Sequence, residues 1–518
     1  MRHKYNRELI KSLAKGKKEI NVTELTNEYC SRMSVEYSET KRKHINNLIN
    51  RLNIKANVDV KTAKEYHSAK KRKIKKRSKT FIVTWAQAHT PINDIAWEGM
   101  KALSEDYGSE IIVIPGTYVN PQSRYSNLDT GWSPELIPYL HAKEDKLHKY
   151  LSLISDANVL PTAERPLRGF EGVTGEESSI IGHPRHHLEV VPTLPQSKDK
   201  YLVTTGAITV PNYRNARVGK KAKFHHQIGF VVVEIFDKND FVIRHVSCNK
   251  DGTFQDLNRV WDGSKISKTG KWESIVFGDL HIRRHHEGML KETERLMNKM
   301  KPKQAIIHDL SDGESVNPHT QKDFVHQVIS AKKGLNLIDK ELEEVKHWLE
   351  EWKKWNLVIV PANHNDWIDR WVRFQTGRND TANAITYNNL QSILFEEKAP
   401  KGLLAYLVDD WFKGEVKTLH RNDSFKSLGH ELNNHGDIGA NGSRGSKNIY
   451  KKLNIKVVSG HSHTPYTLDG AYGVGISTVK DHVYNLGLSS WIQSHGVINE
   501  NGKFQHLFYV GGKFTNFL

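Results

Sequence analysis

Carboxylate, imidazole and amide side chains follow four apolar runs in the second half of this 518-residue chain. The runs are SIVFGDLH, AIIHDLSD, LVIVPANHND and IKVVSGHSH, and their polar residues are Asp279, His281, Asp309, Asp312, Asn363, His364, His461 and His463. A further candidate, His435 in NNHGD, lies on a loop between the third and fourth runs. Oxygen and imidazole ligands without thiolates suit hard or borderline divalent metals.

The candidate ligands are numerous enough for two ions that share a carboxylate. Two such ions, about 3.5 to 4 Å apart, can bind a phosphate ester, lower the pKa of a bridging water and neutralise charge in the transition state. The chemistry expected of these residues is therefore phosphoester hydrolysis. Since histidine must be neutral to bind a metal, metal loading should fail in acid.

The four apolar runs read as buried strands that alternate with helical patterns. Residues 287–300 form one predicted helix, and a longer one is predicted by the spacing of Ile338, Leu342, Val345, Leu349 and Trp352. Ligands of open α/β sheets sit at the carboxyl ends of strands, where the following loops converge. We therefore expect a layered α/β domain over residues 271–518 that brings the polar residues together at one edge.

The order D-x-H, D-x-x-D, N-H, a lone His and G-H-x-H resembles the calcineurin-like metallophosphoesterase superfamily, including its DNA-repair nuclease branch. The resemblance covers residues 271–518. It implies a β-sandwich flanked by helices. It also implies two divalent metal ions as cofactors, with manganese as the expected metal and magnesium, zinc or iron as alternatives.

The resemblance also implies a role for each candidate. The ligands implied for one ion are Asp279, His281 and His463. Those implied for the other ion are Asn363, His435 and His461. Asp309 would bridge the two ions, and Asp312 would orient neighbouring ligands without binding metal. His364 would be the catalytic histidine, which stabilises the phosphoryl oxygens or protonates the leaving oxygen.

Two positions depart from the family pattern. His308 stands where glycine usually precedes the bridging aspartate, and Asn365 stands where an acid usually follows the N-H pair. Neither is expected to bind metal directly, but both put the packing of their turns in doubt. Asp366 is a candidate replacement for the missing acid.

The loop ligand has rivals in the same long insertion, namely His420 and His430. We prefer His435 because glycine follows it and because its distance from the last motif is suitable.

Three arginines are candidates for substrate contact. Arg283 and Arg284 directly follow His281, although a solvated helix start would also explain them. Arg444 lies in the glycine-rich loop GDIGANGSRGS, whose amides could hold a phosphate or which could be a flexible surface loop. The segment GHPRHH at 182–187 imitates the last metal motif but lacks partner carboxylates nearby, so we interpret it as structural or substrate-facing.

The positive charge of the chain belongs to one end. Residues 1–80 hold 23 Lys and Arg against 8 Asp and Glu, which accounts for +15 of the net +17. Helices are predicted over Asn6–Gly16, Thr23–Cys30 and Ser38–Leu52. This pattern fits a helix-turn-helix module and any other small basic helical bundle equally well. The following run, Lys70–Lys79, is typical of a linker or arm, with a solvated spacer and a nuclear localisation tract as alternatives. Its position beside the basic helices favours contact with phosphates. We therefore expect residues 1–80 to be a basic DNA-binding module and arm.

Residues 81–270 are predicted to be a mixed α/β accessory domain. FIVTW and IIVIP flank a helical pattern at 93–106, which predicts a βαβ start. Residues 117–200 are rich in loops, and the stretch to about residue 250 is rich in strands. No repeat stands out.

The remaining composition argues against secretion and membranes. The two cysteines, Cys30 and Cys248, are far apart, so a disulfide framework and a thiolate zinc site are excluded. No apolar run approaches the roughly 18 residues that span a membrane. We expect a cytoplasmic protein, in the host cytoplasm if a phage encodes it, since the long first half and the Gly-Ala-Asn-Gly loop resemble large phage-encoded members of the superfamily. A homo-oligomer is compatible with the sequence.

The first hypothesis is a metal-dependent deoxyribonuclease whose basic end delivers DNA, which fits phage-directed degradation of host DNA. A phosphoprotein phosphatase or nucleotidase with the same metal centre is the second. A non-catalytic DNA-binding scaffold is the third.

Overall fold

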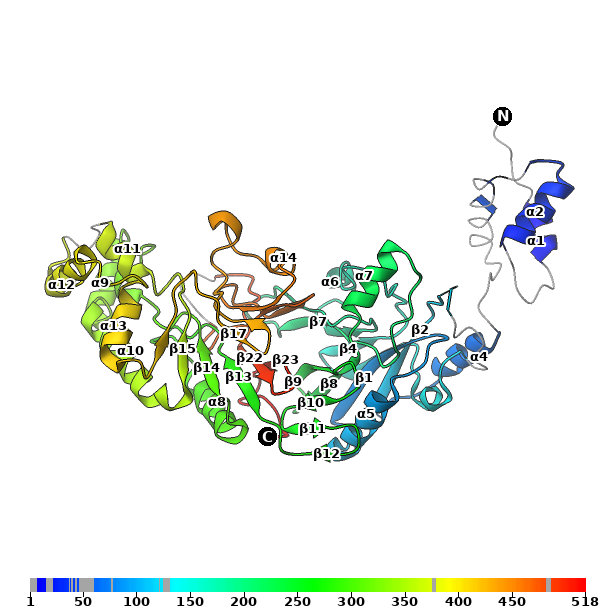
Figure 1. Cartoon of the computed structure of the whole chain (residues 1–518), viewed down its shortest axis with the longest axis horizontal. Helices are drawn as coiled ribbons and strands as arrows, with labels where there is room; N and C mark the ends of the chain where they lie inside the picture. Colours follow the sequence, from blue (N-terminus) through cyan, green and yellow to red (C-terminus); the bar gives the residue numbers. More distant parts are fainter. Residues whose placement is uncertain are drawn as a thin grey trace.

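The protein is described from a computed structural model (Figure 1). The described residues are 7–14, 22–36, 38, 41, 44–45, 60–75, 78–120, 122–123, 131–374, 379–480 and 486–518. The fold is mixed α/β, as expected. The described residues form four sheets, of which three contain both parallel and antiparallel strand pairs and the smallest is antiparallel. Within these residues, no helix is both long enough and apolar enough to cross a bilayer.

The amino-terminal helices form a small unit with its own core. These helices are α1 (Arg7–Ala14) and α2 (Val22–Arg32), and their core contains Ile10, Leu13, Leu25 and Tyr29. Both elements were predicted, whereas the third predicted helix, Ser38–Leu52, lies largely outside the described residues. A further helix, α4 (Val60–Ala69), was not predicted and packs on the next part of the chain.

A six-stranded sheet holds most of the candidate residues. Its order is β16-β15-β14-β13-β22-β23. The strands are β13 (Trp272–Val276), β14 (Gln304–Ile307), β15 (Leu357–Ile359), β16 (Lys417–Thr418), β22 (Ser494–Asn499) and β23 (Phe504–Phe508). Strands β13 to β16 are parallel to one another, and β22 is antiparallel to β13.

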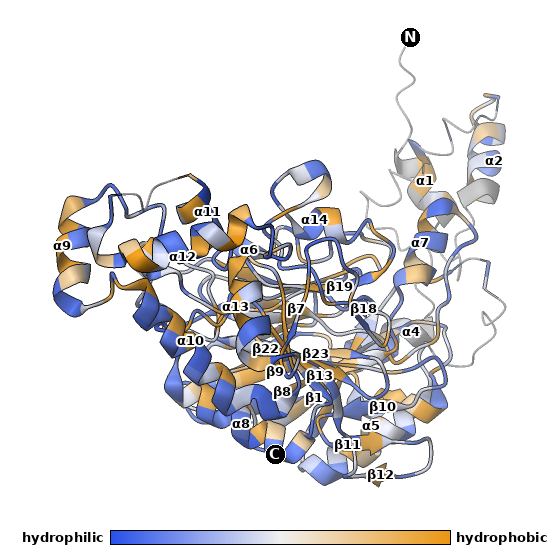
Figure 2. Ribbon diagram, turned by 60° about the vertical axis from the view of Figure 1, so that its left-hand side comes forward, coloured by the Kyte–Doolittle hydropathy of each residue, from blue (hydrophilic) through white to orange (hydrophobic). Residues whose placement is uncertain are grey.

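Helices cover one face of this sheet. They are α8 (Glu287–Met300), α10 (Ile338–Trp352), α11 (Trp367–Arg373), α12 (Ala384–Phe395) and α13 (Leu403–Phe412). Helix α9 (Phe324–Lys333) contributes no residue to their core. The predicted helix at 287–300 is confirmed. Apolar residues at helical spacing on α8 and α10, among them Leu296, Val345 and Leu349, form the core beneath the helices. Figure 2 shows hydrophobic residues gathered on the central strands and hydrophilic ones along the outer side of α10.

The other face of the six-stranded sheet packs on a ten-stranded sheet. Val276 and Ile306 of the first sheet meet Val458 and Val474 in one buried cluster. The order of the large sheet is β17-β18-β19-β21-β20-β6-β7-β5-β4-β3. The strands from the second half of the chain are β17 (Lys426–Ser427), β18 (His430–Glu431), β19 (Lys456–Ser459), β20 (Tyr466–Leu468) and β21 (Ala471–Gly473).

The first half of the chain contributes the rest of this sheet. Its strands are β3 (Glu144–His148), β4 (Leu151–Ile154), β5 (Ser178–Ile181), β6 (Leu188–Val191) and β7 (Lys200–Thr204). The segment 117–200, expected to be mostly loop, therefore contains short strands. Two short helices, α6 (Phe170–Val173) and α14 (Lys447–Tyr450), border the sheet.

The first half also builds a four-stranded sheet in the order β2-β1-β8-β9. Its strands are β1 (Thr80–Gln87), β2 (Glu110–Gly116), β8 (Gly229–Ile235) and β9 (Phe241–Ser247). The predicted βαβ start is confirmed, with α5 (Asp94–Tyr107) between β1 and β2. The basic helix α7 (Arg217–His225) precedes β8, and a small sheet of β10 (Phe254–Asp256), β11 (Arg259–Trp261) and β12 (Ile266–Ser267) follows β9.

Part of the basic run at 70–79 is attached to this sheet. Arg72 donates to the carboxylate of Glu110 (3.1 Å) and to the carbonyl of Ile111 (3.0 Å), and Ile74 is buried. The linker expected over this run is thus docked at Arg72 and Ile74, whereas Lys71 and Lys73 remain exposed.

Candidate metal centre

Strand ends bring the predicted residues together. Asp279, Asp309 and Asn363 follow the parallel neighbours β13, β14 and β15, so all three lie at the carboxyl edge of the six-stranded sheet. His461 and His463 follow β19, which lies in the facing sheet. The site therefore forms where the carboxyl ends of strands from two packed sheets meet.

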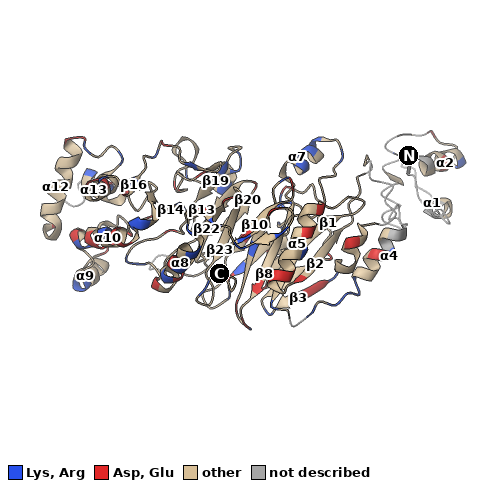
Figure 3. Cartoon of the chain, turned by 60° about the horizontal axis from the view of Figure 1, so that its bottom comes forward, with Lys and Arg blue, Asp and Glu red and all other residues tan. Residues whose placement is uncertain are grey.

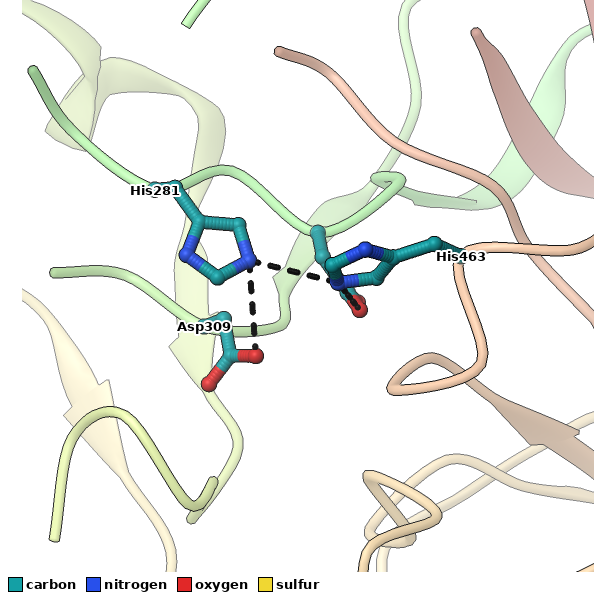
Figure 4. Close-up of side chains that lie close together, drawn as sticks. His281, Asp309 and His463 are labelled. Atoms are coloured by element: carbon teal, nitrogen blue, oxygen red, sulfur yellow. Dashed lines mark hydrogen bonds and ion pairs between the residues drawn. The ribbon is translucent and has the colours of Figure 1, made fainter. Parts of the chain in front are cut away.

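The first group of ligand atoms comprises Asp279, His281, Asp309 and His463, which are all buried and lie within 4.8 Å of one another. His281 Nε2 lies 3.6 Å from Asp309 Oδ2 and 3.4 Å from His463 Nε2. His463 Nε2 lies 3.1 Å from Asp279 Oδ2. Figure 4 shows the rings of His281 and His463 directed toward each other beside the carboxylate of Asp309. This group contains the three residues implied as ligands of one ion, together with Asp309, the residue implied to bridge the two ions.

The second group lies on the other side of Asp309. His435 Nε2 is 3.1 Å from Asp309 Oδ2 and 3.0 Å from Asn363 Oδ1. His461 Nδ1 is 2.9 Å from the same Asn363 oxygen. Asp309 Oδ2 therefore faces His281 on one side and His435 on the other, which is the position of a bridging ligand.

The site has features that a bound cation would satisfy. Two imidazole nitrogens of His281 and His463 face each other, and Asp279 Oδ1 is buried without a hydrogen-bond partner in the described part of the chain. A buried carboxylate oxygen without a partner is costly unless a cation or a donor compensates it. The residues therefore fit a metal centre.

Backbone strain is concentrated at the same residues. The φ angles of His281, Asp309, His461 and His463 are 45°, 43°, 61° and 55°, in the left-handed region that costs a non-glycine residue about 1–3 kcal/mol. Gly460 is required for close approach, because a Cβ there would lie 2.1 Å from Asp279 Oδ1. The turns thus hold the ligands in conformations that the relaxed chain would avoid.

The carboxylates dominate the electrostatics. Burial alone would lower the pKa of His435, but the negative charges of Asp309 and Asp279 outweigh it and raise that pKa to about 9. Burial alone would raise the pKa of Asp309, but His435 and His364 hold it well below its ordinary value. Positive charge is therefore favoured at this point even before an ion binds.

His364 and Asp312 lie beside the first group. Asp312 Oδ1 is 3.2 Å from His281 Nδ1, where it orients that ring. His364 Nδ1 is 2.7 Å from the carbonyl oxygen of Asp312. Because a carbonyl only accepts, Nδ1 carries the hydrogen and Nε2 is left for another partner. Burial lowers the pKa of His364 to about 4, so an anionic ligand would be needed to favour its charged form.

A cavity of about 370 Å³ opens next to His364. Its lining includes Arg284, Asn317, His319, Asn363 and Trp367. The Trp367 indole lies against the His364 ring, with centroids 3.7 Å apart. The cavity thus combines polar groups, a cation and an aromatic ring beside the candidate metal ligands.

The structure distinguishes between the three histidines considered as the loop ligand. His435 contacts Asp309 directly, as given above. His430 is buried on β18 against Tyr472, with ring centroids 5.9 Å apart, and His420 Nδ1 accepts from the N–H of Asn422. Of the three, the structure brings His435 to the site.

The departures from the family pattern have visible consequences. His308 is fully buried and offers a ring nitrogen within 4.8 Å of ligand atoms of Asp279 and His435. Neither nitrogen of that ring has a hydrogen-bond partner among the described residues. Asn365 accepts from the N–H of Ser311 (3.3 Å), and so it braces the turn where an acid was expected.

The candidate arginines have different surroundings. The side chain of Arg283 is 5% exposed and donates to Glu344 (2.6 Å) and to the carbonyl of Leu335 (2.9 Å), so its guanidinium holds α10 in place and is not offered to a substrate. Arg284 lines the cavity and pairs with Glu314 at 2.9 Å. Arg444 lies on an exposed loop.

Two positioning residues were missed by sequence reasoning. Glu341, on α10, accepts from the N–H groups of Gly313 (2.6 Å) and Ser315 (3.0 Å) and fixes the loop after β14. Arg421 joins the carboxylates of Asp366 (2.6 Å) and Asp437 (2.9 Å), which ties the His435 loop to the turn after β15. Neither residue belongs to a motif, and no local signal distinguishes them from surface charges.

The chain is similar to Protein A1 of Escherichia phage T5, with 28% identity over 468 residues that cover 85% of this chain and 83% of that protein. No protein-family model matches the chain, and no solved structure matches it. The similarity extends over most of both proteins and supports a T5-like phage protein.

Proposed function

We propose that the protein is a nuclease of the calcineurin-like metallophosphoesterase type, which hydrolyses DNA phosphodiester bonds at a two-metal centre. The observation that carries the proposal is the position of Asp309 Oδ2 between two groups of metal-ligating side chains, at 3.6 Å from His281 and 3.1 Å from His435. The superfamily assignment rests on the order of the motifs and on this convergence.

Each residue has a role in the proposed reaction. Asp279, His281 and His463 would hold one ion, Asn363, His435 and His461 the other, and Asp309 both. Bound ions of this kind supply a nucleophilic water and neutralise developing charge. His364, held through Nδ1 by the Asp312 carbonyl, would direct Nε2 toward the phosphoryl oxygens or the leaving oxygen. The anionic phosphate would favour the protonated form that this role requires.

The cavity beside His364 suits a nucleotide. Its volume of about 370 Å³ lies within the usual range of small-ligand sites. The exposed ring of His319 offers an aromatic surface to a base, and Arg284 offers a cation to a phosphate. This combination favours a nucleic-acid end or a flipped nucleotide over a phosphoprotein side chain.

The proposed biological role is phage-directed degradation of host DNA in the host cytoplasm. The similar protein comes from phage T5, and the basic residues 1–80 would attract DNA through its phosphates. A homo-oligomer is compatible with this role.

The test is to incubate circular and linear duplex DNA with the protein and Mn²⁺, Mg²⁺ or Zn²⁺, beside a His364→Ala variant. If the wild type cleaves DNA faster than the His364→Ala variant, the result supports the nuclease. Rapid hydrolysis of a phosphoprotein or a mononucleotide without DNA cutting would favour the phosphatase or nucleotidase. If the protein binds DNA but the wild type and the variant do not differ in DNA cleavage, the result would favour the non-catalytic DNA-binding scaffold.

A further inference from the structure

The two halves of the chain repeat one strand order. The four-stranded sheet reads β2-β1-β8-β9, and the six-stranded sheet contains the corresponding series β14-β13-β22-β23. In both four-strand series the first pair is parallel, and the other two pairs are antiparallel. The connection between the first two strands is a 14-residue helix in each half, α5 and α8.

The ten-stranded sheet contains the same repetition. Strand β5 is parallel to β7, which is antiparallel to β6, and β19 is parallel to β21, which is antiparallel to β20. The two series meet at β6 and β20, which are corresponding strands and pair antiparallel. Corresponding elements that contact each other in this way are related by a twofold axis, as in a symmetric dimer. Figure 1 shows the corresponding edge strands β9 and β23 next to each other at the centre of the molecule.

Local details agree with two copies of one domain. The helix caps correspond, since Asn93 caps α5 through the N–H of Ala96 and His286 caps α8 through the N–H of Met289. The sequences at matching places are FIVTWAQ and IVFGDLH, IIGHPR and VSGHSH, and TTGAITV and GVGISTV. The segment GHPRHH is therefore the counterpart of the last metal motif. The repeat does not stand out in the sequence because short motifs and strand order are all that the copies retain.

The first copy has lost the metal site. Trp85 holds the place of Asp279: its N–H bonds to the Gly206 carbonyl (3.2 Å), as the Asp279 N–H bonds to the Gly475 carbonyl (3.0 Å). The Trp85 indole lies against Gly182, the counterpart of Gly460, where a Cβ would meet it at 2.8 Å. An apolar ring thus fills the position of a ligand carboxylate.

Other ligand positions have changed as well. Within the matching segments GHPR and GHSH, Arg185 stands at the position of His463. The four-stranded sheet ends at β2, where the six-stranded sheet continues with β15 and β16 and so provides Asn363 and His364. A metal centre of the same kind cannot form in the first copy.

A cavity of about 290 Å³ lies between the changed motif and the second copy. Arg185, Lys451 and Lys456 supply positive charge to its wall, against the single carboxylate of Asp469. Arg185 is 2% exposed, and although Nη1 pairs with Asp469 at 3.1 Å, its Nε and Nη2 have no hydrogen-bond partner among the described residues. Burial lowers the pKa of His226, His245 and His506 to about 4, 4 and 3, so these wall residues are neutral at pH 7.

A basic helix borders the same cavity. Helix α7 ends at Phe224 and His225, which line the cavity, and Figure 3 shows the Lys and Arg positions of its ribbon in blue. Lys220 and Lys223 are exposed, and Phe224 is 73% exposed. A cavity with unpaired guanidinium donors, next to exposed lysines and an aromatic ring, is complementary to a phosphate backbone with its bases.

We propose that the first half is a metal-free copy of the catalytic domain and that the cavity beside its former metal site binds a phosphate group of a DNA strand. Binding here would hold DNA on the first copy while the second copy cuts it. The DNA ligand rests on the proposed function, whereas the phosphate chemistry rests on Arg185, Lys451 and Lys456.

The test measures DNA binding in EDTA, where hydrolysis is silent. A labelled oligonucleotide is titrated into the full-length protein, with inorganic phosphate and a mononucleotide as competitors. The variants are Arg185→Gln and the surface double variant Lys220→Gln/Lys223→Gln, with Lys291→Gln/Lys299→Gln on α8 as the matched control. The double variant guards against misfolding of the buried Arg185 variant.

We expect Arg185→Gln to weaken binding about tenfold, as for loss of a charged hydrogen bond worth about 1.4 kcal/mol. The α7 double variant should reduce the slope of log K against log salt by about 1.4 for single strands or 1.8 for duplex. Competition by phosphate alone would indicate an anion site, and competition only by the mononucleotide would indicate that the base contributes. Binding by both variants that equals the control would overturn the proposal, even if the protein cuts DNA with manganese. If the variants show the expected losses of DNA binding but the wild type cuts no DNA, the result would instead contradict the proposed nuclease.

Discussion

The carboxylate of Asp309 and the ring of His435 meet with Oδ2 and Nε2 3.1 Å apart, although a long insertion separates them in the sequence. Asp309 follows β14, and His435 lies on a loop that Arg421 ties to the neighbouring turn. This contact places Asp309 between the two ligand groups. The following predictions test what the contact and its surroundings do.

Replacement of His364, the proposed catalytic histidine, should separate chemistry from metal binding. His364→Ala should lower DNA cleavage about 10²- to 10⁴-fold, as for loss of a general acid or an equivalent donor. Bound metal, measured by elemental analysis, should stay near the wild-type amount because Asn363 and Asp309 are untouched. A variant that loses its metal in parallel with its activity would show that His364 is structural.

His308 should influence metal affinity. Its ring is buried without a hydrogen-bond partner in the described chain and approaches Asp279 and His435. His308→Gln should weaken the binding of one ion about 10- to 100-fold, as measured for residues that support metal ligands. The measurement is a competitive chelator titration with manganese. His326→Gln, at the outer cavity wall, is the control, and equal affinities of the two variants would remove His308 from the site.

A buried network joins the two halves through Arg244. Its guanidinium pairs with Glu234 and with Asp256 (2.7 and 2.8 Å), and Gln505 also donates to Asp256 (2.9 Å). Arg244→Met would leave two buried carboxylates without their cation and should lower the free energy of unfolding by about 3–5 kcal/mol. Urea denaturation measures this, with the exposed Lys268→Met as control. A loss below about 1 kcal/mol, the size of a surface pair, would contradict the assigned role.

Acid should weaken the contact of Asp469 with the first copy. Burial alone would raise its pKa, but the hydrogen bond from His187 and the charges of His187 and Arg185 outweigh it and hold the pKa below the ordinary value. A carboxyl group whose pKa is depressed by folding stabilises the fold at pH values above its unfolded-state pKa of about 3.9. This stabilisation is lost as the pH falls through the folded-state pKa. Asp469→Asn should therefore be less stable than wild type at pH 7, with a gap that narrows below about pH 4. Urea midpoints at pH 7, 5, 4 and 3 measure the gap, and a gap that widens in acid would have the wrong sign.

The sequence predicted which candidate residues would converge better than it predicted the residues that support them. Asp279, Asp309 and His461 follow apolar runs, and strand ends converge by the rules of α/β sheets, so their neighbourhood could be anticipated. Glu341 could not, because its partners are backbone N–H groups of a distant loop. Arg283 looked available beside His281, but the backbone turn with φ of 87° directs it to Glu344.

The fold of the first half was harder to predict for a related reason. Strands such as β4, β5 and β6 have only four residues each, too few for a clear alternation of apolar and polar positions. Their pairing depends on partners far along the chain, and β6 pairs with β20 of the second half. The composition of Lys70–Lys79 likewise gave no sign that Arg72 would bind Glu110.

The most direct test of the two-metal centre is to measure bound metal and DNA cleavage on the same samples of wild type and Asp309→Asn, with the exposed Asp410→Asn as control. After loading with manganese, elemental analysis should find two ions per chain in wild type and control, and close to none in Asp309→Asn, whose DNA cleavage should be lost. Near-normal metal occupancy in Asp309→Asn, or cleavage that survives without bound metal, would contradict the account.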